Sequence, residues 1–194
     1  PRYRVSLKRR RMCRTDYRRR KNAVLSKTPR LVVRGSLKNI LAQVVEALPS
    51  GDRTLTAANS SELVEHGWKV PCGNVPAAYL TGLIIGIKAQ PLGIKQVTLD
   101  IGLRRPSPGS RVFAVLKGAM DSGLNVPCGE VLPKESRIRG EHIASYAKEL
   151  VEAESNEYKR RFSEYLSKGL KPEELPTHFD EVRSNILHAF KKEG

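Results

Sequence analysis

The sequence lacks the patterns that mark secreted, zinc-binding and membrane-spanning proteins. Its three cysteines, Cys13, Cys72 and Cys128, are odd in number and far apart, with no Cys-x-x-Cys pair and only four histidines in 194 residues. Neither a disulfide framework nor a zinc module is indicated. No apolar run resembles a signal peptide or is long enough to cross a bilayer, so we expect a cytoplasmic protein with no membrane partner.

Acidic residues are scarce at one end of the chain, where positive charge gathers. The sequence carries 35 Lys and Arg against 20 Asp and Glu, a formal net charge of +15. Residues 1–34 hold 14 basic residues and 1 acidic residue, whereas residues 35–134 hold 10 and 7 and residues 135–194 hold 11 and 12. Such an arm cannot bury itself and repels itself until it meets a polyanion. Tyr3 and Tyr17 offer stacking faces among its arginines, which favours RNA over a nuclear-localisation run or a solvated cluster.

A sheet is expected directly behind the arm. Runs rich in Val, Ile, Leu and Thr, joined by short turns, predict an antiparallel three-strand meander over residues 30–34, 39–47 and 54–59. In the second strand Ile40, Ala42 and Val44 point one way and Gln43 points the other, so one face is partly polar. That face is a candidate surface for RNA.

An unusually apolar helix is expected next. Asn74 can cap it, and it runs over residues 75–90. Gly82 and Gly86 keep one side thin enough for close packing, which we assign to packing on the sheet. The apolar run is too short for the membrane meaning of a Gly-x-x-x-Gly pattern.

A strand, a basic loop and a second helix complete the expected core. The strand covers residues 96–102 and should lie parallel to a neighbour, because it is reached through a helix. The helix ends at Ser122. The loop between them lacks the Gly-Lys-Ser/Thr of a nucleotide-binding loop, so we assign Arg104, Arg105 and Arg111 to RNA phosphates, with ordinary solvated arginines as the alternative.

The sequence therefore predicts an α/β fold in three parts: a basic arm over residues 1–28, a mixed α/β core over 29–134 and a helical C-terminal extension over 135–194. The core combines a three-strand antiparallel meander with parallel pairing and packed helices. In the arm, Thr15 or Asp16 can cap a helix over residues 17–25. In the extension, three modest helices are expected, the last behind a Thr177 cap. Arg137 and Arg139 are its candidate phosphate contacts, with simple helix packing as the alternative.

Metal-dependent nucleases of the ribonuclease H-like fold begin with the same order of strands and helices, so catalysis is an alternative to RNA binding. Those enzymes hold two metals with carboxylates from the first strand, the first long helix and the fourth strand. Here only Asp100 is in place, so a nuclease is the disfavoured alternative and Asp100 is interpreted as a salt-bridging residue at a strand end. A polybasic membrane-surface protein is a third alternative, without an apolar anchor.

One repeated motif has no assigned role in the predicted fold or in RNA binding. The string Gly-x-x-Val-Pro-Cys-Gly occurs at residues 67–73 and again at 123–129. We interpret it as two similar turns. A paired or metal-bridged Cys72 and Cys128 is the alternative hypothesis.

Five motifs resemble one family when taken together and in order. They are RTDYRRRK (residues 14–21), PRLVVR (29–34), NVPAAYLTGL (74–83), LDIGLRRP (99–106) and GEHIA (140–144). With them the chain resembles, over almost its whole length, the large-subunit ribosomal protein L-eighteen family, called L-five in eukaryotes, in its archaeal form. Cys72 and Cys128 are not recognised features of that family, so no role transfers to them.

The resemblance implies a structural protein that binds 5S ribosomal RNA and anchors it to large-subunit ribosomal RNA in the central protuberance, beside neighbouring ribosomal proteins. It implies no catalysis, cofactor, metal or small-molecule substrate. The 5S contacts that it implies are Arg14, Tyr17, Arg18, Arg19, Arg20, Lys21, Arg30, Arg34, Lys38 and Gln43. The residues that it assigns to an extension into the large ribosomal RNA are Arg2, Arg4, Lys8, Arg9, Arg10 and Arg11.

Overall fold

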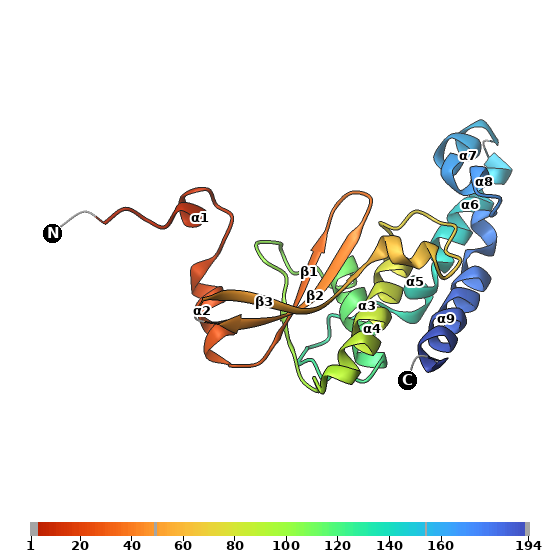
Figure 1. Cartoon of the computed structure of the whole chain (residues 1–194). Coiled ribbons are helices and arrows are strands. Elements are labelled where there is room, and N and C mark those ends of the chain that lie inside the picture. Colours follow the sequence, from red (N-terminus) through yellow and green to blue (C-terminus); the bar gives the residue numbers. More distant parts are fainter. Residues whose placement is uncertain (1–3, 49, 154, 193–194) are drawn as a thin grey trace.

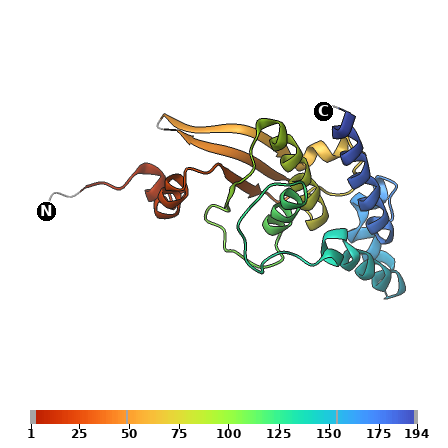
Figure 2. The same cartoon turned by 90° about the horizontal axis from the view of Figure 1, so that it is seen from below.

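The basic arm and the C-terminal extension lie at opposite ends of the molecule, with the sheet and its helices between them (Figures 1 and 2). The structure is a computed structural model that describes residues 4–48, 50–153 and 155–192. The strands are β1 (Arg30–Gly35), β2 (Ile40–Leu48), β3 (Gly51–Asn59) and β4 (Thr98–Asp100). The α-helices are α1 (Lys8–Arg11), α2 (Tyr17–Leu25), α3 (Val75–Ala89), α4 (Arg111–Asp121), α5 (Glu135–Arg139), α6 (Glu141–Ala153), α7 (Ser155–Arg161), α8 (Ser163–Ser167) and α9 (Leu175–Lys192). Short 3₁₀ helices are η1 (Ser60–Val64), η2 (Gln90–Leu92) and η3 (Pro172–Glu174).

The four strands form one mixed sheet in the order β3-β2-β1-β4. β1 and β2 pair antiparallel, as do β2 and β3, while β4 pairs parallel with β1 and places Leu99 beside Leu31. This arrangement confirms the predicted α/β class, with its antiparallel meander and parallel strand. The short turns force neighbouring strands to run in opposite directions, and only the long crossover through α3 allows a parallel partner.

The two faces of the sheet have different roles. Leu31, Val33, Ile40 and Val44 are almost fully buried and pack into the core with α3 and α4. Residues at the alternate positions point to the opposite face, because successive side chains of a strand alternate. There Val32 of β1 lies beside Gln43 of β2. The core helices therefore leave free the partly polar face that the sequence indicated.

Helix α3 packs against α4 at unusually short range. A Cβ on Gly82 would overlap the carbonyl of Val115, and a Cβ on Gly118 would overlap the carbonyl of Tyr79. The close packing expected at Gly82 and Gly86 is confirmed, but its assignment to the sheet is wrong. The glycines face a second helix, since Gly86 likewise meets Ser122 of the α4 C-cap.

The C-terminal extension docks through α9 and α5. The ring of His178 stacks on Trp68 at 5.4 Å between ring centroids, and Phe179 packs against Tyr79 at 5.7 Å. Ile186 of α9 is fully buried. The extension is therefore held to the core by aromatic contacts between residues that are 100 or more positions apart in the sequence.

Local predictions and observed elements differ in five places. Helix α9 begins at Leu175 after η3, so the expected Thr177 cap is wrong and Thr177 lies inside the helix. The second of the three helices expected in the extension is divided between α7 and α8. Strand β3 starts at Gly51, before the expected position 54, and β4 covers only Thr98–Asp100 of the expected range 96–102. Helix α1 was not expected. Among the described residues, no helix is long and apolar enough to span a membrane.

The docking of His178 predicts a pH-dependent stability. Burial lowers the pKa of this imidazole below its ordinary 6.5, and Nε2 accepts a hydrogen bond of 3.2 Å from the Lys69 N–H. Protonation therefore costs more in the folded chain than in the unfolded one. The stabilisation is complete above the unfolded pKa and is lost as the pH falls through the lower folded pKa.

We expect the free energy of unfolding to decrease between about pH 7 and pH 5. The variant His178→Phe keeps an aromatic ring on Trp68 but cannot titrate, so it should show a smaller decrease in denaturant titrations at each pH. His142, whose pKa is also lowered by burial, leaves a residual pH dependence in both proteins. Identical pH profiles for the two proteins would contradict this role of His178.

Candidate RNA interface

Helix α2 is fixed in place at both its start and its middle. The Asp16 carboxylate caps it by accepting hydrogen bonds from the N–H groups of Arg18 and Arg19, at 2.9 and 3.2 Å. This confirms the predicted helix and selects Asp16 over Thr15 as its cap. Arg20 then reaches across to Asp52 of β3 and forms an ion pair of 2.8 Å. The arm is thereby attached to the sheet.

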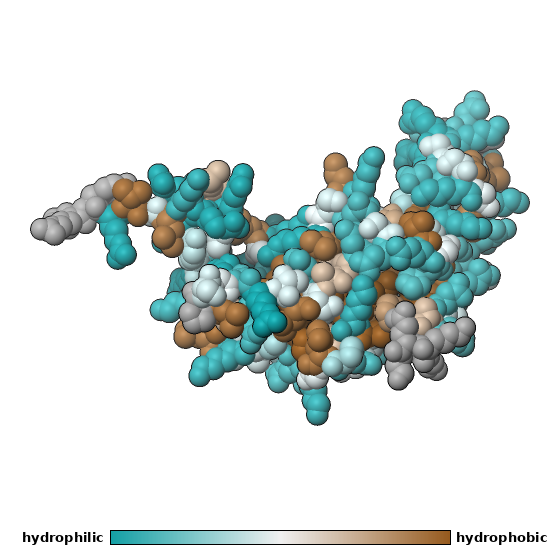
Figure 3. All heavy atoms as spheres, viewed as in Figure 1, coloured by the Kyte–Doolittle hydropathy of each residue, from teal (hydrophilic) through white to brown (hydrophobic). Residues whose placement is uncertain are grey.

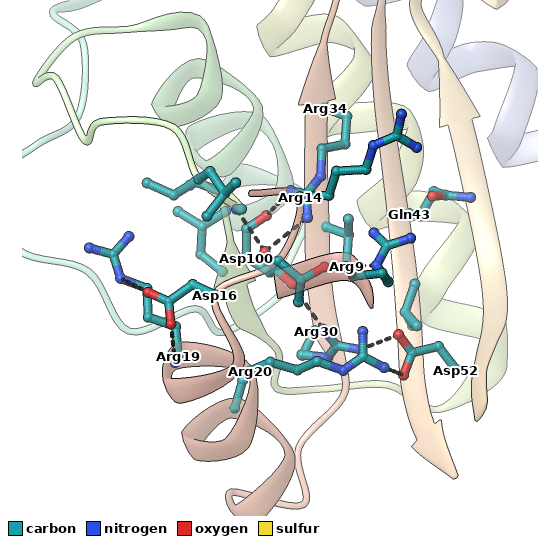
Figure 4. A pocket seen from close by; sticks show the side chains of 18 of the residues that line it. Arg9, Arg14, Asp16, Arg19, Arg20, Arg30, Arg34, Gln43, Asp52 and Asp100 are labelled. Carbon is teal, nitrogen blue, oxygen red and sulfur yellow. Dashed lines mark hydrogen bonds and ion pairs between the residues drawn. The ribbon is translucent and has the colours of Figure 1, made fainter. Parts of the chain in front are cut away.

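A chain of ion pairs continues from Asp52 along the sheet (Figure 4). Arg30, whose side chain is only 4% exposed, pairs with Asp52 at 2.9 Å and with Asp100 at 2.9 Å. Asp100 in turn pairs with Arg34 at 3.0 Å. Two carboxylates thus orient the guanidinium groups of Arg20, Arg30 and Arg34, which come from the arm and from β1.

Asp100 is held in its ionised form. Burial acts to raise its pKa, but hydrogen bonds from Arg34 and the Gly102 N–H, with the charges of Arg34 and Arg30, outweigh burial and lower it. The interpretation of Asp100 as a salt-bridging residue at a strand end is confirmed. Its oxygens are engaged by arginines rather than gathered with other carboxylates, and the part of the chain that the structure describes contains no cluster of three or more potential metal ligands.

The variant Asp100→Ala tests how much this chain of ion pairs contributes to stability. It leaves the buried Arg30 with a single carboxylate partner, so we expect the free energy of unfolding to fall by about 1–3 kcal/mol. As the control, Glu157→Ala removes the carboxylate that pairs with the exposed Arg160 and Arg161. Such a surface pair contributes about 0–1 kcal/mol. Equal effects of the two variants in chemical denaturation would contradict the structural role of Asp100.

The arm and the sheet enclose a cavity of about 490 Å³. Its walls carry six arginines against three aspartates, so the cavity is positive overall: Arg9, Arg14, Arg19, Arg20, Arg30 and Arg34 face Asp16, Asp52 and Asp100. Gln43 and Val32 of the free sheet face also line it. The structure thus brings together seven of the candidate RNA-binding residues, from the arm, β1 and β2, around one cavity.

The remaining candidates of the arm lie outside this cavity. Hydrophilic side chains dominate the surface over α1 and α2, with a few apolar ones among them (Figure 3). Arg4, Lys8, Arg10 and Arg11 are exposed in or next to α1, Arg18 and Lys21 are exposed on α2, Tyr17 is partly buried, and Lys38 is exposed in the β1–β2 turn. Arg2 lies outside the described residues. These side chains are available to a polyanion without any rearrangement of the core.

The basic loop before α4 has a more structural arrangement than the sequence indicated. Arg104 donates a hydrogen bond to the carbonyl of Gly35. Arg111 donates to the carbonyls of Ser36 and Gly73, at 3.1 and 2.8 Å, and so ties two loops together. Arg105 is exposed and makes no ion pair or hydrogen bond with the described residues. Of the three, Arg105 has the guanidinium most available for phosphate.

The candidates in the extension lie away from the cavity, at the junction with the core. Arg139 pairs with Asp180 of α9 and, at 3.9 Å, with Glu141. Arg137 is exposed on α5. The arrangement of Arg139 matches the alternative of helix packing, whereas Arg137 remains accessible.

Asp52 lines the cavity and pairs with Arg20 and Arg30, yet sequence reasoning did not single it out. It lies at the start of β3 in a stretch that was interpreted as a turn, and nothing local distinguishes it from other turn aspartates. The two turns that carry the repeated cysteine motif are not joined by a disulfide bond. Cys72 and Cys128 are free thiols, with Cys72 Sγ 3.9 Å from the Val70 carbonyl and Cys128 Sγ 3.7 Å from Met120 Sδ.

Comparison with known protein families identifies a family that matches most of this chain. The family described as "Ribosomal large subunit proteins 60S L5, and 50S L18" matches residues 1–92 and 89–129. The match covers the arm, the sheet, α3 and α4, which is well over half of the chain. It confirms the resemblance seen in the motifs and with it a structural role in the ribosome, in contact with ribosomal RNA. The chain therefore belongs to this family of ribosomal large-subunit proteins.

Proposed function

We propose that this protein binds 5S ribosomal RNA and anchors it to large-subunit ribosomal RNA in the central protuberance, where it contacts neighbouring ribosomal proteins. The observation that carries the proposal is the joint cavity, in which arginines of the arm and of β1 are held side by side by Asp52 and Asp100. A solvated charge cluster needs no such fixed geometry. The role is structural and not enzymatic.

Binding divides into two contributions. The exposed Lys and Arg of the arm neutralise phosphates and release counterions, so log affinity should fall against log salt by about 0.7–0.9 per phosphate neutralised. The free sheet face adds recognition of shape, unstacked bases and 2′-hydroxyl groups, which is how proteins distinguish one RNA from another. Affinity comes mainly from the arm, and specificity mainly from the sheet.

The three parts of the chain have separate tasks in this proposal. Arg14, Tyr17, Arg18, Arg19 and Lys21 contact 5S RNA from the arm, residues 4–11 extend toward the large ribosomal RNA, and residues 29–134 form the folded platform. Residues 135–194 pack on this platform and offer Arg137 as a phosphate contact. Arg20 and Arg30 act chiefly by holding the arm against the sheet.

Equilibrium binding of the purified protein to 5S ribosomal RNA, across a salt series and with transfer RNA as competitor, tests the proposal. Tight binding to 5S RNA that survives both competitor and moderate salt is expected. Equal affinity for the two RNAs, erased by salt in the same way, would contradict a specific 5S partner and leave only a generic polycation.

A further inference from the structure

The cavity between the arm and the sheet has the size of a binding pocket rather than of a phosphate contact. Its volume of about 490 Å³ lies within the range of about 300–1,000 Å³ typical of pockets for small organic ligands. A phosphate bound by surface arginines needs no enclosed space. The cavity can take a group as large as one nucleotide.

The lining is apolar at the sheet and polar around it. Val32, Val45, Leu99 and Ile101 line the cavity together with the guanidinium groups. Gln43 lies directly beside Val32 across the β1–β2 pairing, and its amide makes no hydrogen bond with the residues that the structure describes. An apolar surface next to planar guanidinium groups and one amide suits the flat face and the polar edge of a nucleobase.

Arg30 shows that one wall of the cavity is preformed. Its side chain is only 4% exposed, it lines the cavity, and it pairs with Asp52 and with Asp100 at 2.9 Å each. Because two ion pairs hold this guanidinium, a ligand in the cavity meets a fixed wall rather than mobile surface side chains.

Asp52 and Asp100 set the charge of this wall. They pair with Arg30 and Arg34, which reduces the net positive charge beside the apolar surface while keeping both guanidinium planes in place. Arg9 and Arg14 make no ion pair with the residues that the structure describes, so the uncompensated charge lies at these two, toward the arm. A ligand with a neutral, flat part and an anionic part matches this division, and a nucleotide has both.

We infer that the cavity takes one unstacked nucleotide of the bound RNA, with its base against Val32 and Val45, its edge hydrogen-bonded to Gln43 and its phosphate toward the arm arginines. The inference rests on the proposed function and identifies where an unpaired base is recognised. Asp52 and Asp100 are positioning residues, which act through the arginines that they hold.

The test combines two variants of the cavity with a salt series on 5S RNA. Val32→Phe fills the apolar surface and Gln43→Ala removes the amide. Val32→Phe should weaken binding by about tenfold to a hundredfold, the effect of losing one stacked base. Gln43→Ala should weaken it by about threefold to tenfold, the effect of losing one hydrogen bond. The slope of log affinity against log salt should stay that of the wild type, because no phosphate contact is lost. Arg18→Gln, outside the cavity, should instead reduce the slope by about 0.7–0.9.

Chemical probing of base reactivity on the same complexes identifies the nucleotide. In the wild-type complex one unpaired base should be protected, and both cavity variants should restore its reactivity. Val151→Phe, at an exposed position on α6, is the control for added bulk, and melting curves confirm that every variant is folded. If Val32→Phe does not fold, Gln43→Ala still decides the matter, since its side chain contributes no hydrogen bond to the described structure.

Two failures are distinguishable. Wild-type protein without preference for 5S RNA would overturn the proposed function, and this inference with it. Wild-type protein that prefers 5S RNA, together with cavity variants of unchanged affinity and unchanged base reactivity, would overturn the nucleotide pocket alone.

Discussion

Deletion of residues 1–22 is expected to weaken binding to 5S ribosomal RNA by about a thousandfold at moderate salt, while the core remains folded. The deletion removes 11 basic residues and 1 acidic residue. Contacts to about six or more phosphates account for changes in affinity of this order. The core should survive because neither α1 nor α2 contributes a fully buried residue, and Arg30 retains both of its carboxylate partners.

A variant of unchanged length separates the effect of the arm's charge from the effect of removing its residues. Arg18→Gln, Arg19→Gln and Lys21→Gln in one protein keep the Asp16 cap and the Arg20–Asp52 ion pair. If all three side chains contact phosphates, the salt slope should decrease in magnitude by about 2–3. The control removes the same charge from the extension, as Lys148→Gln, Lys168→Gln and Lys171→Gln, and should leave the slope nearly unchanged.

The outcome that would contradict this assignment is a deletion variant that binds 5S RNA as tightly as the full chain. A fall in affinity accompanied by loss of the folded signal in circular dichroism would also count against it, since the arm would then support the core. In either case the sheet and extension would have to provide the main RNA contacts.

The parts of this structure that sequence reasoning predicted well depend on local signals. Asp16 and Asn74 cap their helices because a short polar side chain two or three residues before free N–H groups satisfies them, whatever lies elsewhere in the chain. The alternation of Ile40, Ala42 and Val44 with Gln43 is equally local. Such features can be recognised without knowing the fold.

The parts that sequence reasoning missed depend on tertiary contacts between residues far apart in the sequence. Arg30 could be recognised as a basic residue of the first strand. Its burial between Asp52 and Asp100, however, requires β1 to pair with β4 and β2 to pair with β3, which starts at Gly51 beside Asp52. Likewise Arg111 has the same local context as a phosphate-binding arginine. Only the fold shows that it faces the Ser36 and Gly73 carbonyls. Charge alone does not distinguish an arginine that contacts RNA from one that holds a loop.

The largest effect on stability is expected at the crossing of α3 and α4. Helix propensity alone predicts that Gly82→Ala stabilises the protein by about 1 kcal/mol, because alanine is the better helix former. The structure predicts the opposite sign. The added Cβ would overlap the backbone of Val115, which cannot rotate away as a side chain could, so the two helices must separate.

Separation of α3 from α4 disturbs the central packing of the core, since Leu80, Leu83 and Leu116 are buried along the same pair of helices. We expect Gly82→Ala to lower the free energy of unfolding by about 3 kcal/mol, at the upper end of the cost of overpacking. This corresponds to a fall in Tm of roughly 6–12 °C for a protein of this size. Gly118→Ala should behave similarly, because its Cβ meets the carbonyl of Tyr79.

Gly129→Ala is the matched control. A Cβ at this position has no atom within 4 Å, so its effect on stability should stay within about 0.5 kcal/mol. Denaturant titration of the three variants beside the wild type measures all the differences. A neutral or stabilising Gly82→Ala would show that the helices can part at little cost, and that α3 and α4 do not form the rigid support that holds the sheet and its RNA-facing side in place.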